Sequence, residues 1–286
     1  MPDMSSTDIT FRKAPLLEIV VELRWQPAMQ AVLAPTVGSQ PAMQVLPAAP
    51  VGSQQVPSVF LPTPQVENLI HRFGSEVYKR DFQRTERLVP SGFPILPGQA
   101  ISRFKKADAD NVLYQIGIGM FSANAVPPYR SWSQFAPEVA SGVEALLAAR
   151  EASERERPFS PVSLRYINAF RSDLTGDRDV NEFLREVFNI KLELPDVVSS
   201  LAPETSPKPL VIIKLVTPVG TLQMTAGDAN IAGSPGIVLD MNLISSEQIE
   251  PKVDAVMNVL NDAHVVIRDI FLEMTKPIRA LLDPEH

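Results

Sequence analysis

The same order of patterns occurs twice along this chain of 286 residues, and that order limits the fold more than any other feature. Each half begins with a segment of alternating apolar and polar residues, at 15–25 and at 162–170. A helical pattern, further strand patterns and a long helical pattern then follow in both halves. Strands grouped with helices that cover one face are typical of α+β proteins. We therefore predict an α+β fold of two similar lobes of antiparallel sheet with covering helices, which a duplication of one unit would explain.

The first half is predicted to span 15–150, after a polar leader at 1–14. Its first strand places Leu17, Ile19, Val21 and Leu23 on one face and Glu18, Val20, Glu22 and Arg24 on the other. A helix is predicted from the spacing of Val66, Leu69, Ile70, Phe73 and Val77. Strands at 99–107 and 112–124 would form a hairpin, because the Asp and Asn residues of 108–111 favour turns. A helix over 131–152 would close this half.

The second half is predicted to span 161–286, after a charged linker at 151–160. Asp179 can cap a helix over 179–188. Three strands are predicted at 209–217, 220–226 and 237–244, with a Gly- and Ala-rich loop at 227–236 before the last one. Apolar residues at intervals of three and four predict a long helix over 252–282.

A proline-rich insertion interrupts the first half at 26–64. This stretch contains no Asp, Glu, Lys or Arg and has eight prolines, and the tetrapeptides PAMQ and VGSQ each occur in it twice. Such a composition has neither helical nor strand periodicity. It could dock on a partner through proline-rich recognition. A duplicated loop insertion is the interpretation that we favour, because the entropy of closing a loop rises slowly with its length.

The composition narrows the classes of function. The chain has no cysteine, so thiolate chemistry and disulfides are excluded. A net charge of −7 makes nucleic acid an improbable partner, since nucleic-acid affinity rests on Lys and Arg. We find no apolar run that would span a membrane and no signal core, and we expect a cytoplasmic protein. The three histidines lack metal-ligand spacing, and no nucleophile elbow, dinucleotide fingerprint or phosphate-binding loop occurs. We therefore predict no catalytic residue, no metal and no cofactor.

The candidate binding residues are polar or aromatic side chains within apolar segments. Tyr166 and Asn168 share one face of the strand at 162–170, and Arg165 lies on the other. Arg165 would either clamp an anionic group or form a structural ion pair, with Glu18 or Glu22 as its partner if the two strands are neighbours. Tyr129 and Trp132 would form a docking surface or a hydrophobic staple on the core.

Several motifs resemble those of one protein family. They are PLLEIVVELRW at 15–25, YRSWSQF at 129–135, PVSLRYINAF at 161–170 with DVNEFLREVFNIKLELP at 179–195, and AHVVIRDIFLEMT at 263–275. The chain resembles a sporadically distributed prokaryotic family of uncharacterised proteins with an N-terminal PL-x-E strand and a central LRYIN motif. The patchy occurrence of that family implies mobile or defence-linked genes, including toxin–antitoxin and antiphage loci.

Three classes of function follow as expectations. The first is a non-enzymatic binding or regulatory component of a mobile defence-type module, which acts through contacts with a protein encoded nearby. The second is a small-molecule-binding domain with an apolar cavity between the sheet and the last helix, into which Arg165 or Tyr166 reaches. The third is an enzyme that uses dispersed Asp, Glu and Arg residues with perturbed pKa values in one cleft. The formation of homo-oligomers stays open.

Overall fold

Nine antiparallel strands form a single sheet in this protein. The structure is a computed structural model that describes residues 9–27, 63–96, 98–128, 131–201 and 208–285. The strands of the first half are β1 (Leu16–Arg24), β2 (Arg84–Arg87), β3 (Ala100–Lys105), β4 (Val112–Gly117) and β5 (Met120–Ala125). Those of the second half are β6 (Val162–Phe170), β7 (Leu210–Val216), β8 (Gly220–Ile231) and β9 (Ser234–Ser245). The fold is thus α+β, as the sequence predicted.

The two halves share one sheet instead of forming a sheet each. The strand order is β2-β3-β4-β5-β1-β6-β9-β8-β7, so the first strand of each half lies at the centre and the two pair with each other. Outward from this central pair, each half continues with its last strand and then runs backwards through its hairpins. The prediction of separate sheets was wrong because the alternation in a strand identifies its faces but not the neighbour at its edge.

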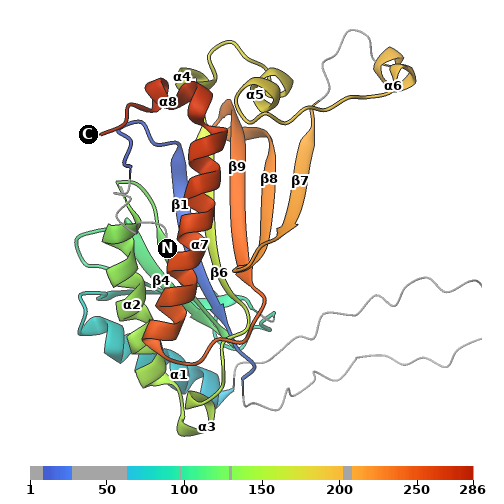
Figure 1. The fold of residues 1–286 in the computed structure, drawn as a ribbon. Coiled ribbons are helices and arrows are strands. Elements are labelled where there is room, and N and C mark those ends of the chain that lie inside the picture. The colour runs from blue at the N-terminus through green and yellow to red at the C-terminus, as the bar shows by residue number, and fades with distance from the viewer. Residues whose placement is uncertain (1–8, 28–62, 97, 129–130, 202–207, 286) are drawn as a thin grey trace, which may run out of the picture.

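The long helices lie on one face of this sheet (Figure 1). They are α1 (Pro64–Tyr78), α2 (Trp132–Ala149) and α7 (Val253–Met274). Short helices occupy the connections: α3 (Ala152–Arg155), α4 (Ser172–Thr175), α5 (Val180–Glu186), α6 (Asp196–Ser200), η1 (Lys276–Ile278) and α8 (Arg279–Leu282). Helix α5 begins as predicted, since Asp179 and Glu182 form a capping box. The last long helix is shorter than predicted, because α7 ends at Met274 and η1 and α8 follow it as separate turns.

Two tight turns lie within segments that were predicted as a single strand and as a loop. The predicted strand 112–124 is the hairpin β4–β5, which turns at Gly119 with a φ of 63°. A side chain at Gly119 would lie 2.4 Å from the Trp25 carbonyl oxygen, so only glycine fits. The predicted loop 227–236 is mostly strand, because Ala232 and Gly233 connect β8 to β9 with positive φ angles of 53° and 89°. Positive φ at both central residues is typical of two-residue hairpin turns.

The remaining predicted segments have mixed outcomes. Most of the insertion at 26–64 lies outside the described residues. Its last residue, Pro64, is the first residue of α1. Proline is favoured there because a backbone N–H at this position would have no acceptor within the helix. The charged stretch 151–160 contains α3, in which Glu154 is buried and accepts a hydrogen bond from Trp25 Nε1 at 3.3 Å. Of the polar leader, residues 9–14 are described, and Phe11 forms a β-bridge with Pro284 near the other end of the chain.

An ion pair connects α1 to the last residue of β2. Arg87 donates hydrogen bonds of 2.7 and 2.6 Å to the two carboxylate oxygens of Glu67. These bonds hold the pKa of the Glu67 carboxyl below its ordinary value of 4.5. A carboxyl with a lowered pKa in the folded protein stabilises it above the pKa of the unfolded chain. That contribution is lost as the pH falls through the folded-state pKa.

We expect the substitution Glu67→Gln to lower the free energy of unfolding by about 0.5–1 kcal/mol at neutral pH, because the pair is bidentate but partly exposed. The loss should shrink towards zero in acid, below the pKa of Glu67 in the wild type. Urea denaturation of both proteins at neutral pH and at about pH 3 measures this. An equal loss at both pH values would contradict the assignment of the stabilisation to the charged pair.

Candidate functional site

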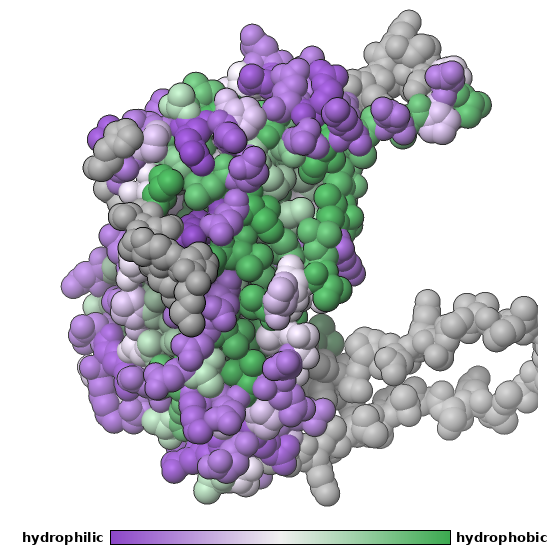
Figure 2. Space-filling model, in the orientation of Figure 1, coloured by the Kyte–Doolittle hydropathy of each residue, from purple (hydrophilic) through white to green (hydrophobic). Residues whose placement is uncertain are grey.

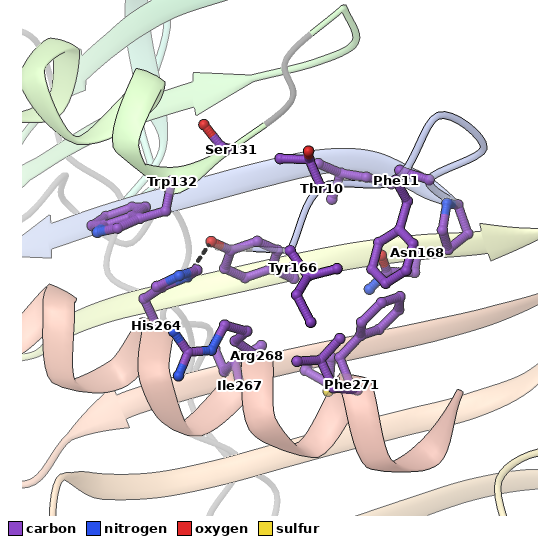
Figure 3. Close-up of a pocket in the computed structure, with 16 residues that line it drawn as sticks. Thr10, Phe11, Ser131, Trp132, Tyr166, Asn168, His264, Ile267, Arg268 and Phe271 are labelled. Carbon is purple, nitrogen blue, oxygen red and sulfur yellow. Dashed lines mark hydrogen bonds between the residues drawn. The ribbon is translucent and has the colours of Figure 1, made fainter. Parts of the chain in front are cut away.

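An apolar pocket lies between α7 and the sheet, at the end where the first described residues cross the molecule (Figure 3). Its volume is about 100 Å³. Residues from six parts of the chain line it: the N-terminal segment, the first residue of β1, the start of α2, strands β6 and β9, and α7. The apolar lining residues are Ile9, Phe11, Ala14, Pro15, Leu16, Trp132, Met241, Ile267, Phe271 and Leu272. The polar ones are Thr10, Ser131, Tyr166, Asn168, His264 and Arg268.

A cluster of three rings forms one wall of the pocket. The Tyr166 hydroxyl and His264 Nδ1 are 2.8 Å apart in a hydrogen bond. Trp132 stacks on the His264 ring, with the ring centroids 5.4 Å apart and an angle of 15° between the planes. The indole Nε1 of Trp132 donates a hydrogen bond of 2.7 Å to Asn261 Oδ1. Asn261 and His264 of α7 therefore both contact Trp132, and His264 also contacts Tyr166.

The other end of the pocket holds a buried amide. Figure 3 places Asn168 beside Phe11 and Phe271, with Tyr166 between this end and the Trp132–His264 pair. Asn168 is 4% exposed, and its Nδ2 has no hydrogen-bond acceptor among the residues that the structure describes. A buried donor without an acceptor costs about 1–3 kcal/mol of folding free energy. An acceptor on a bound molecule would satisfy this donor.

Arg165 lies on the opposite face of the sheet, as the alternation along β6 predicted. Its guanidinium donates two hydrogen bonds, of 2.8 and 2.5 Å, to Asp240 on β9. The hydrogen bond to Asp240 raises the pKa of Arg165, and the charges of Glu18 and Glu22 add to this effect. Arg165 thus does not reach the pocket, and the structural ion pair describes its role better than the anion clamp.

The two candidate glutamates on β1 have other partners. Strands β1 and β6 are neighbours, with Val20 opposite Arg165, so Glu18 and Glu22 lie diagonally from the guanidinium. Glu18 accepts a hydrogen bond of 2.7 Å from Asn124, and Glu22 pairs with Arg24 at 2.5 Å. Asp240, and not Glu18 or Glu22, is the ion-pair partner of Arg165, because β9 places it beside Arg165 on the same face of the sheet.

Three of the seven sequence candidates meet at the pocket, and one cannot be placed. Trp132, Tyr166 and Asn168 line it. Tyr129 lies outside the described residues. His264 was not among the candidates, but it is buried and lines the pocket. The spacing of Asn261, His264 and Arg268 on one flank of the last helix was the available signal, because polar residues three or four apart share a helix face.

The chain matches no protein-family model, no curated protein and no solved structure. Within the described ranges, no helix is long and apolar enough to cross a membrane. The same residues contain no group of three or more His, Asp or Glu side chains that could hold a metal ion. The function is therefore inferred from the geometry of the pocket.

Proposed function

We propose that this protein binds a small, mainly apolar molecule in the pocket between α7 and the sheet, and that the molecule carries one hydrogen-bond acceptor. The observation that carries this proposal is the buried Nδ2 of Asn168, which has no acceptor among the residues that the structure describes. Ligand pockets are typically apolar, with a few polar groups that fix the orientation of the ligand. Here Asn168 would orient the acceptor, and the rings of Phe11, Trp132 and Phe271 would contact the apolar part.

The size of the pocket limits the ligand. Its volume of about 100 Å³ is smaller than an engineered apolar cavity of about 150 Å³ that binds benzene. The ligand, or the part of it that enters, is therefore no larger than a small ring. We propose binding without catalysis, since no carboxylate belongs to the described lining and the Nδ1 atom of His264 is engaged by Tyr166.

Fluorescence titration with cyclopentanone tests the proposal. This probe is a small apolar ring with a single carbonyl acceptor. The chain contains two tryptophans, of which Trp132 lines the pocket and Trp25 does not. In the variant Trp25→Phe, we expect cyclopentanone to change the Trp132 emission along a saturable curve. Methylenecyclopentane has the same shape but no acceptor, and we expect it to bind at least about tenfold more weakly because Asn168 stays unpaired.

The matched control is the variant Trp132→Phe, in which Trp25 is the remaining fluorophore. Its emission should show only the weak, linear quenching of a tryptophan away from the ligand. A saturable change of equal size in both variants would place the binding elsewhere. A linear response in the Trp25→Phe variant would contradict the proposal.

A second candidate function is that of a partner-binding component in a cytoplasmic, defence-type module. It rests on the family resemblance and is supported by large apolar side chains at the surface, which in soluble proteins often belong to protein interfaces. Examples are Leu210, Ile212 and Val216 of β7. Co-purification with the neighbouring gene products, for the wild type and for a variant without residues 27–54, tests it. Loss of a stoichiometric partner in the deletion variant would assign the docking role to the insertion instead.

We also propose that a duplication produced the two halves. The mirrored strand order supports it, since β1, β5, β4 and β3 correspond in position to β6, β9, β8 and β7. An experimental structure tests this by superposition of these two sets of strands. Superposition no better than that of unrelated antiparallel sheets would count against a duplication.

A further inference from the structure

The two halves of the sheet differ in how helices cover their outer strands. In the first half, α1 follows the first strand and packs over β3 and β4. Its Phe73 lies on the rings of Phe104 and Phe121, at centroid distances of 5.3 and 5.7 Å. In the second half, the described chain between β6 and β7 forms the short helices α4, α5 and α6, of which α5 packs against β8, and Figure 1 shows none of them over β7. Within the described residues, no helix therefore covers β7 as α1 covers β3.

The helix side of β7 is apolar. Ile213 of β7 pairs with Met224 of β8, which pairs with Met241 of β9, and Met241 pairs with Tyr166, so these residues face the helix side of the sheet. On either side of Ile213 along β7, Val211 and Leu215 share this face, and Leu215 is 44% exposed. Figure 2 shows a hydrophobic surface between α7 and the edge of the sheet. We call the surface formed by Val211, Ile213 and Leu215 the β7 face.

The adjacent flank of α7 extends this apolar surface. Val259, Val266 and Ile270 share that flank and are half-buried. They lie on the flank of α7 opposite to His264 and Arg268, which line the pocket. The β7 face and the pocket are thus separate surfaces on the two sides of one helix.

A second apolar surface is carried by the segment before β7. Residues 191–201, which include α6, have five large apolar side chains that are 44% to 80% exposed: Leu192, Leu194, Val197, Val198 and Leu201. Figure 1 shows α6 standing away from the body of the protein. This segment, which we call the α6 arm, lies between the first and second strands of its half, as α1 does in the other half.

The geometry points to a dimer in which the α6 arm of one copy docks on the β7 face of a second copy. The arm and the face are both apolar. The five arm side chains are exposed in the single chain, and on the β7 face Leu215 is exposed while Val211 and Ile213 are half-buried. A two-fold axis would let both copies exchange arms, so that both arms and both faces are buried at once. The one charged residue of β7, Lys214, is on the opposite face of the strand and would not obstruct the contact.

Light scattering during size-exclusion chromatography of the purified chain tests this inference. We expect a dimer for the wild type, and monomers for the arm variant Leu201→Asp and for the face variant Leu215→Asp. Each variant should raise the dissociation constant of the dimer at least about tenfold, since each places a charge in an apolar contact. The control Lys214→Glu changes the same strand on its other face and should leave the dimer intact.

A mixture of the two monomeric variants gives the sharpest result. The arm variant retains a normal β7 face and the face variant retains a normal arm, so one of the two exchanged contacts can form between them. We expect a heterodimer from the mixture and none from either variant alone. Circular dichroism checks that both variants are folded.

Three results would overturn the inference: a wild type that stays monomeric at all concentrations, a dimer that both variants leave unchanged, or a monomer whose β7 face is taken by a different protein. None of these results bears on the pocket, because cyclopentanone binding can be measured on the monomeric variants.

Discussion

Replacing Asn168 by leucine is expected to raise the free energy of unfolding by about 1–3 kcal/mol and to weaken cyclopentanone binding at least about tenfold. Asn168 is buried, and its Nδ2 has no acceptor among the described residues, so the folded protein without ligand carries an unsatisfied donor. Leucine has a similar shape and removes that donor. The same change deprives the ligand of its hydrogen bond. Urea denaturation and the titration in the Trp25→Phe background measure the two effects.

Asn242 provides a matched control on the other face of the sheet. Its Oδ1 is also buried without a donor among the described residues, and its register partners on the neighbouring strands are Arg165 and Gln223. The variant Asn242→Leu should therefore leave cyclopentanone binding unchanged. If Asn168→Leu destabilises the protein, or if both leucine variants weaken binding equally, Asn168 is not the ligand-binding donor.

Truncation of Phe73 to alanine should have the largest effect on stability, a loss of about 3–5 kcal/mol. The ring is fully buried and contacts Phe104, Tyr114 and Phe121 with centroid distances of 5.3 to 6.2 Å. Its removal leaves a cavity between α1 and the sheet, and edge-to-face ring contacts are lost as well. The midpoint of urea denaturation should fall accordingly, without a change in the slope of the transition.

Tyr78 at the end of the same helix is the control for this truncation. It is 60% exposed, so Tyr78→Ala should change the free energy of unfolding by no more than about 0.5 kcal/mol. A loss below about 1 kcal/mol for Phe73→Ala would mean that α1 does not cover the sheet as described.

Local patterns predicted most elements of the fold, and elements without such a pattern were missed. The alternation in β6, and in β1 from Glu18 onwards, gave the correct faces, because a half-buried strand has a period of two. At the start of β1 a register shift places Leu16 opposite Asn168, so the predicted alternation does not extend to Leu17. Strand β2 has the sequence RTER, in which no apolar residue marks a buried face. The pairing of β1 with β6 could not be predicted either, because it joins residues far apart in the chain and no local pattern marks it.

Some residues of the site could also be identified from local patterns, and others could not. Tyr166 and Asn168 could be selected because polar side chains on the covered face of an apolar strand need partners. Phe11 could not, since it reaches the pocket through a bridge to Pro284 at the other end of the chain. The partner of Arg165 was missed for a related reason. The sequence identified the face of the guanidinium, but Asp240 is supplied by β9, whose place beside β6 depends on the whole sheet.

Intermolecular nuclear Overhauser effects between cyclopentanone and the protein would test the ligand-binding proposal most directly. We expect contacts from the ring protons of the probe to the Trp132 indole and the Phe271 ring, which line the pocket. The Asn168 side-chain amide should shift as the probe saturates. Contacts confined to residues outside the pocket, or none at saturating probe, would contradict the proposal that this pocket is the binding site.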